Sequence, residues 1–150
     1  MGIKHFTHIG ICVSNMEKSL EFYRQALGFE PTREILITDT HATLLQIPDL
    51  ILHSQFIERD NCSLELLWFE SPGHIGETAF HPMNTLGFAH LSFTVADIED
   101  VIAKIVQYGG STHPETRMTR TRDDGTRVEL MFCQDPDGVR VELVNELGPG

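Results

Sequence analysis

The sequence predicts an α+β fold built from two modules, each with the order strand, helix, strand, strand, strand. The apolar stretch around His8 returns around His90, 82 residues later. Each copy runs directly into an acidic helix start, at residues 15–17 in the first and 97–99 in the second. Self-similarity at a fixed offset is the sequence signature of a repeated structural unit. We therefore expect two βαβββ modules whose sheets are mostly antiparallel.

The length of 150 residues fits one domain, and halves of about 75 residues are small for independent folding. We predict a single domain over residues 1–150, made of a module at 5–70 and a module at 87–146. Residues 71–86 are rich in glycine and proline and show no clear period, so they form the predicted linker.

The first module opens with a predicted strand and helix. Residues 5–13 are apolar and partly β-branched, which is typical of a strand. Ser14 and Glu17 match a capping box, with Ser14 as the N-cap. Apolar side chains then recur at helical spacing until Gly28, the predicted C-cap.

Strands complete each module. Residues 29–58 predict two or three strands, and residues 62–69 predict another. The second module repeats the order with a strand at 87–95, a helix that ends at Gly109 and a last strand at 139–145. Its hairpin turn is predicted at the Asp-Gly pair of residues 124 and 125.

Charge and composition exclude several classes of partner. The net charge of −11 repels phosphate backbones, so we predict no nucleic-acid partner. No run approaches the ~18 apolar residues of a membrane span, and the N-terminus lacks a secretory apolar segment. Cys12, Cys62 and Cys133 lie within apolar runs, which predicts buried thiols in a reducing cytoplasm.

Strand alternation places a histidine and a glutamate of each module away from the apolar face. His8 and His90 alternate with apolar residues in the first strand of each module. Glu65 and Glu142 do so in the last strand, 77 residues apart, so loop lengths must differ between the modules.

A carboxylate buried in a sheet must be paired, protonated or bound to a metal. One reading is a His–Glu ion pair inside each module. Because the pair is duplicated, we predict instead that His8, Glu65, His90 and Glu142 bind one divalent metal ion. Two imidazoles and two carboxylates suit Zn²⁺, Ni²⁺ or Co²⁺, and also Mn²⁺ or Fe²⁺.

The chain also resembles a known superfamily along nearly its whole length. The matching motifs are His8-Ile9-Gly10-Ile11, residues 16–23, Leu27-Gly28-Phe29, Leu64-Glu65-Leu66, His90-Leu91, residues 135–138 and Val141-Glu142-Leu143. With these motifs it resembles the vicinal oxygen chelate superfamily, which includes glyoxalase I, methylmalonyl-CoA epimerase, extradiol dioxygenases and bleomycin-resistance proteins. The resemblance implies sheets curled around one metal, a small-molecule substrate and a homodimer whose site lies within one chain or between two.

A ligand set of His-Glu-His-Glu looks most like that of glyoxalase I. The resemblance therefore implies a metal-dependent lyase or isomerase that abstracts a proton α to a carbonyl, while the ion stabilises the enediolate. We predict Glu142 as the base, with Glu65 serving the opposite face of the substrate. Bacterial glyoxalase I tends to carry an arginine for glutathione where this chain has Cys12, which implies a substrate-binding position.

Arginines gather around the predicted Asp-Gly turn of an otherwise acidic chain. Arg120 and Arg122 are the candidates that would bind a carboxylate or phosphate of the substrate. The alternative is a solvated hairpin whose arginines pair with neighbouring acids.

Three other functions remain open. The sequence of residues 8–11 resembles that of methylmalonyl-CoA epimerases, which would make the protein an epimerase. An Fe²⁺ or Mn²⁺ extradiol dioxygenase would use His8, His90 and Glu142. The third is a non-catalytic protein that binds a small molecule, such as an antibiotic.

Overall fold

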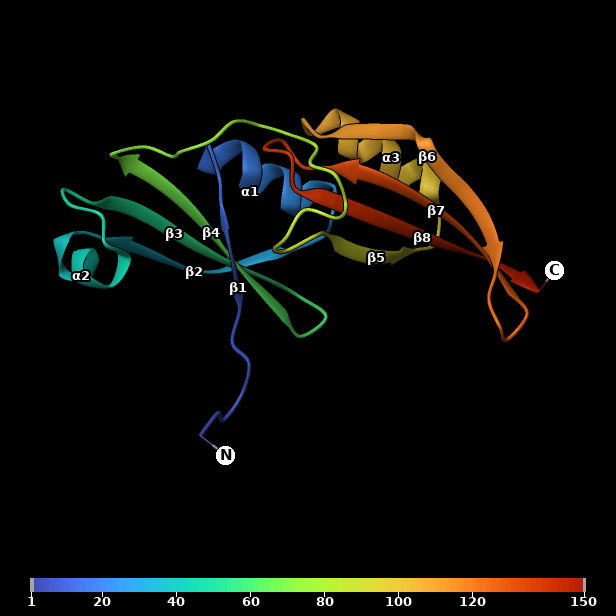
Figure 1. The fold of residues 1–150 in the computed structure, drawn as a ribbon, viewed down its shortest axis with the longest axis horizontal. Helices are drawn as coiled ribbons and strands as arrows, with labels where there is room; N and C mark the ends of the chain where they lie inside the picture. Colours follow the sequence, from blue (N-terminus) through green and yellow to red (C-terminus); the bar gives the residue numbers. More distant parts are fainter. Residues whose placement is uncertain (1, 150) are drawn as a thin grey trace. The chain divides into compact units, whose positions relative to one another are not determined.

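The computed structural model describes residues 2–149 and divides into two compact units, Met1–Gly76 and Glu77–Gly150 (Figure 1). We call these units the N-terminal half and the C-terminal half. Each half contains one four-stranded sheet. None of the helices within residues 2–149 is long and apolar enough to cross a membrane.

The N-terminal half has the order strand, helix, strand, strand, strand. Its elements are β1 (Ile9–Cys12), α1 (Met16–Gln25), β2 (Glu30–Ile37), β3 (Ile51–Arg59) and β4 (Cys62–Ser71). The strands lie in the order β1-β4-β3-β2, and only the β1–β4 pair is parallel. Short helical segments, η1 (Asp39–His41) and α2 (Ala42–Leu45), stand between β2 and β3, where the sequence predicted turns within a region of two or three strands.

The C-terminal half repeats this topology. Its elements are β5 (Leu91–Val95), α3 (Ile98–Gln107), β6 (Ser111–Thr121), β7 (Thr126–Gln134) and β8 (Arg140–Pro149). The strands lie in the order β5-β8-β7-β6, again with one parallel pair, β5–β8. The predicted α+β class and the two βαβββ repeats are therefore confirmed, and both sheets are open.

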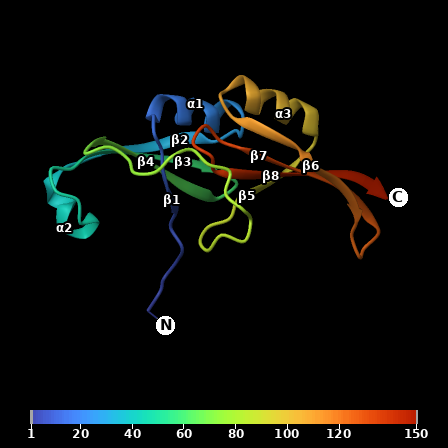
Figure 2. The same cartoon turned by 45° about the horizontal axis from the view of Figure 1, so that its top comes forward.

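A helix covers one face of each sheet (Figure 2). In the N-terminal half, α1 buries Phe22 and Tyr23 and contacts β4, whose Leu64 and Leu66 are buried. Side chains alternate along a strand, so Glu65 emerges on the opposite face. In the C-terminal half, β8 likewise contacts α3 and places Glu142 between buried apolar neighbours.

The first helix begins one residue later than the capping box predicted. Asn15, not Ser14, is the N-cap, and its Oδ1 accepts a hydrogen bond from the Lys18 backbone N–H at 2.9 Å. Glu17 therefore lies one position too early to complete a capping box. Gly28 does follow the helix, with a left-handed φ of +72°.

Both histidine-bearing strands are shorter than predicted. The predicted strands at 5–13 and 87–95 begin only at Ile9 and Leu91, so each histidine lies just ahead of its strand. The reason is the partner strand. Ile9 pairs with Leu64, close to the start of β4, so the residues before His8 run past the end of their neighbour. The same holds for β5 beside β8.

Only one of the three cysteines is buried, against the prediction for all three. Cys12 and Cys62 are exposed, because Cys12 lies on the open face of β1 and Cys62 begins β4 directly after a turn. Cys133 is fully buried on β7, and this burial raises the pKa of its thiol to about 11.

Candidate functional site

In the N-terminal half, Glu65 stands at the centre of the open sheet face. It pairs in register with Gly10 on one side and Phe56 on the other. His8 Nε2 lies 3.0 Å from Glu65 Oε2, and Ser54 Oγ donates to Glu65 Oε1 at 2.6 Å. Both carboxylate oxygens are therefore held, and the side chain is only 15% exposed.

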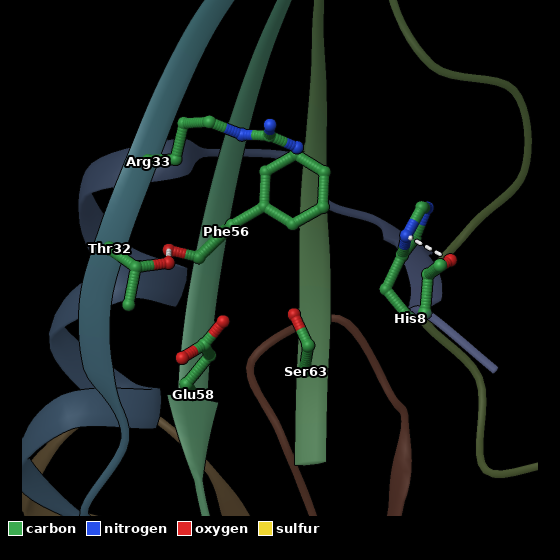
Figure 3. Close-up of a pocket in the computed structure, with 7 residues that line it drawn as sticks. His8, Thr32, Arg33, Phe56, Glu58 and Ser63 are labelled. Carbon is green, nitrogen blue, oxygen red and sulfur yellow. Dashed lines mark hydrogen bonds between the residues drawn. The ribbon is translucent and has the colours of Figure 1, made fainter. Parts of the chain in front are cut away.

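The imidazole of His8 is itself held by two neighbours. Thr7 Oγ1 lies 3.0 Å from His8 Nδ1, the contact drawn as a dashed line in Figure 3. The ring also meets Phe56 edge-on, with 5.1 Å between the ring centres. With Nδ1 engaged by a hydroxyl, Nε2 is the nitrogen presented to Glu65.

The C-terminal half contains a corresponding but looser group. His90 Nε2 lies 3.9 Å from Glu142 Oε1, and Ser92 Oγ donates to that same oxygen at 2.7 Å. Glu142 is 22% exposed. Phe132 pairs in register with Glu142, and its ring lies 5.7 Å from that of His90.

The two groups agree in some positions and differ in others. Phe56 and Phe132 occupy the same register position beside their glutamates. The serines do not correspond, because Ser54 lies on β3 whereas Ser92 lies on β5. Gly10 stands at the N-terminal register position that matches Ser92.

The donor set within each half fits part of a metal site. Ligands bonded to one ion at about 2.1 Å lie roughly 3.0–3.4 Å from each other. The His8–Glu65 separation of 3.0 Å meets this condition, and the His90–Glu142 separation of 3.9 Å needs a small side-chain shift. Within either half, residues 2–149 bring no third His, Cys, Asp or Glu to the pair. The predicted ligand set of His8, Glu65, His90 and Glu142 stays a prediction.

A pocket of about 400 Å³ opens beside His8. It is lined by Thr7, His8, Thr32, Arg33, Phe56, Glu58 and Ser63. Figure 3 shows Arg33 and Glu58 on opposite sides of the Phe56 ring. The pocket therefore presents a cation, an anion and several hydroxyl groups around one aromatic ring.

The predicted substrate-binding residues lie in different places. Cys12 is two residues beyond Gly10 on β1, so it shares the open face with Glu65. Arg122 donates to Glu146 Oε1 at 2.7 Å, and Glu146 lies four residues, about 13 Å, along β8 from Glu142. Arg120 is on the same hairpin, opposite Val128. Both arginines thus lie at the far end of the C-terminal sheet from Glu142, and their roles stay predictions.

Several residues of the site were not predicted from the sequence. Phe56 and Phe132 are 76 residues apart, close to the spacing of the two glutamates, so an alignment of the halves would have found them. Ser54 and Ser92 come from different strands and leave no repeat signal. Arg33 adjoins the pocket only because β2 pairs with β3.

The chain is similar in sequence and in fold to known proteins. The model of the Glyoxalase/Bleomycin resistance protein/Dioxygenase superfamily matches residues 5–143. Uncharacterized protein YwkD of Bacillus subtilis is 30% identical over 146 residues, covering 97% of this chain and 100% of its own. Lactoylglutathione lyase of Neisseria meningitidis is 26% identical over 139 residues, covering 93% and 88%. The crystal structure of a glyoxalase family protein from Bacillus cereus shares the fold, with a TM-score of 0.81, 17% identity and coverage of 99% and 97%.

Proposed function

The chain belongs to the glyoxalase/bleomycin resistance protein/dioxygenase superfamily, and from that premise we propose that it is a metal-dependent lyase or isomerase of the glyoxalase I type. The observation that carries the proposal is the His–Glu pair found at the same register position in both halves. The similarity to lactoylglutathione lyases supports the same class of reaction.

The residues proposed to hold the metal are His8, Glu65, His90 and Glu142. Their nitrogen and oxygen donors suit Zn²⁺, Ni²⁺ or Co²⁺, and also Mn²⁺ or Fe²⁺. When bound, such an ion supplies a Lewis acid that polarises a substrate oxygen.

Glu142 is the proposed general base. Its carboxylate would take the proton from the carbon next to the substrate carbonyl, while the C–H electron pair moves towards that carbonyl. The same carboxylate would then return the proton to the neighbouring carbon. The wider His90–Glu142 separation of 3.9 Å supports this role, because a carboxylate that reaches a substrate must be less tightly held.

Ser92 would orient this base. Its hydroxyl donates to Glu142 Oε1 at 2.7 Å, which holds the carboxylate through one of its two oxygens. Glu65, by contrast, is held on both oxygens by His8 and Ser54, which suits a structural ligand.

We expect the active form to be a homodimer that acts on a small molecule in the cytoplasm. Large apolar side chains on the described surface support association with a second chain. They include Phe6, Ile75, Leu86 and Phe88, which are 77–101% exposed. Analytical ultracentrifugation at several protein concentrations measures the oligomeric state directly.

The reaction is tested by turnover of a methylglyoxal–thiol hemithioacetal with metal-loaded protein. We expect the wild type to form the thioester product, and Glu142→Gln to lower kcat about 10²–10⁴-fold with metal retained. Glu21→Gln is the matched control, since it makes the same change on the exposed surface of α1, outside the site.

Other outcomes would assign other functions. Full turnover by Glu142→Gln would remove Glu142 as the base. Oxygen uptake with catechols would indicate a dioxygenase, and epimerisation of an acyl-CoA would indicate the epimerase reaction. Purified protein without stoichiometric metal would indicate a binding protein.

A further inference from the structure

Arg33 is fixed on an aromatic ring that also contacts the proposed metal ligand His8. Arg33 on β2 pairs in register with Phe56 on β3, and its guanidinium carbon lies 4.4 Å from the centre of the Phe56 ring. That ring is in turn 5.1 Å from the ring of His8. At most about 10 Å therefore separates the guanidinium from the imidazole.

The Arg33 guanidinium donates to no protein group within residues 2–149. The side chain is exposed, no carboxylate of that range lies within ion-pair distance of it, and it lies over the Phe56 ring. A guanidinium carries five N–H donors in a planar fork that matches carboxylate and phosphate oxygens. Its donors are therefore available to a molecule in the pocket beside His8.

Arg140 in the C-terminal half also lies over a phenylalanine ring, but its guanidinium has an acceptor within the protein. Its guanidinium lies 4.6 Å from the centre of the Phe132 ring, the counterpart of Phe56. The centre of the Phe80 ring lies 3.6 Å from the same guanidinium carbon, and Arg140 Nη2 donates to the carbonyl oxygen of His81. Arg140 is consequently only 8% exposed. Residues 2–149 thus supply Arg140 with an oxygen acceptor and offer none to the Arg33 guanidinium.

We infer that Arg33 is a specificity-determining residue that binds an anionic oxygen group, a carboxylate or a phosphate, on the tail of the substrate. The inference rests on the proposed function, because the tail belongs to the molecule whose reacting end lies at His8. The hydroxyl of Ser63 lines the same pocket and can donate to that tail. Glu58, on the other side of Phe56, repels a second anion and so orients the tail towards Arg33 (Figure 3).

The test measures binding to metal-free protein, so that its outcome does not depend on the reaction. Calorimetric titration compares S-methylglutathione with its diethyl ester, and 4′-phosphopantetheine with pantetheine. Each pair keeps the same sulfur-bearing end and differs in the anionic groups, and the two pairs separate carboxylate from phosphate. We expect tighter binding of the anionic member in at least one pair.

The variants then assign that difference to Arg33. Arg33→Gln should weaken binding of the preferred anion about 10–100-fold and leave binding of the partner that lacks the anionic groups unchanged. Arg24→Gln is the matched control, because it removes the same charge from the exposed surface of α1. Glu58→Gln should have the opposite effect and raise the affinity for the anionic ligand a few-fold.

Three results would overturn the inference. The first is that the wild type binds both members of each pair with equal affinity. The second is that Arg33→Gln and Arg24→Gln lose the same amount of affinity for the anionic ligand. The third is that the wild type shows no saturable binding. An inactive protein that still shows the Arg33-dependent preference would contradict the proposed reaction alone. An active protein without that preference would contradict the anion site alone.

Discussion

The two halves of the molecule hold the same His–Glu pair in different ways. In the N-terminal half the pair is 3.0 Å apart, and the glutamate is also held by Ser54 from β3. In the C-terminal half the pair is 3.9 Å apart, and the supporting hydroxyl is Ser92 from β5. The phenylalanine beside each glutamate keeps its register position.

This difference indicates a division of labour between equivalent residues. The topology fixes where a side chain emerges, so both halves present the same two donors. The neighbouring side chains then decide how tightly each carboxylate is held. A carboxylate fixed on both oxygens suits metal binding, and a looser one suits proton transfer.

The largest expected effect separates the two glutamates. Glu142→Gln should lower kcat about 10²–10⁴-fold, whereas Glu65→Gln should chiefly weaken metal affinity, by about 10–100-fold. Steady-state kinetics at saturating metal, together with metal titration of each variant, measures both. Equal effects of the two variants on both quantities would contradict the division of labour.

The cysteines should also differ between the halves. At pH 8 a thiol with a pKa of about 11 is about 0.1% thiolate, so Cys133 should react with iodoacetamide at least ~10²-fold more slowly than an exposed thiol. Cys12 and Cys62, both exposed, should react first. Mass spectrometry of timed samples follows each site, and urea should abolish the difference. Rapid modification of Cys133 in the folded protein would show that it is not buried.

Glycine substitutions should destabilise the halves unequally. Gly138 has a φ of +97°, and an added Cβ would lie 2.7 Å from the carbonyl oxygen of Ala79. Gly138→Ala should therefore lower the free energy of unfolding by about 3 kcal/mol. At Gly28 the nearest atom is the flexible end of Arg59, so Gly28→Ala should cost about 1 kcal/mol. Urea denaturation compares them, and a larger loss for Gly28→Ala would reverse the expected order.

The smallest expected effect concerns the supporting serines. Ser54 is fully buried, so Ser54→Ala should lower the free energy of unfolding by about 1–2 kcal/mol. Ser92 is exposed, and Ser92→Ala should change it by less than about 0.5 kcal/mol. Thermal denaturation of both variants measures the difference. Equal losses would show that burial does not distinguish the two hydroxyls.

The internal repeat allowed the fold to be predicted from the sequence. Alternation around Glu65 and Glu142 correctly predicted buried apolar neighbours on both sides of each glutamate. The strand starts were wrong, because pairing depends on where the neighbouring strand begins and sequence periodicity does not report that. The N-cap was wrong by one residue, since Ser14 and Asn15 are both good capping residues.

Only part of the candidate site could be predicted from the sequence. Histidine and glutamate carry chemistry that a sequence pattern can reveal, and the structure pairs His8 with Glu65 and His90 with Glu142. The serines that hold these carboxylates come from non-equivalent strands. Arg33 reaches the pocket through register between strands, which the local sequence does not encode.

The most direct test of the account is metal titration of chelator-treated wild type, His8→Gln and His90→Gln. If both His–Glu pairs bind one ion, the wild type takes up one equivalent per chain. Either substitution alone should then lower the affinity by a similar large factor, because each removes one of four ligands. Binding of two independent ions per chain, or wild-type affinity in either variant, would contradict a single shared site.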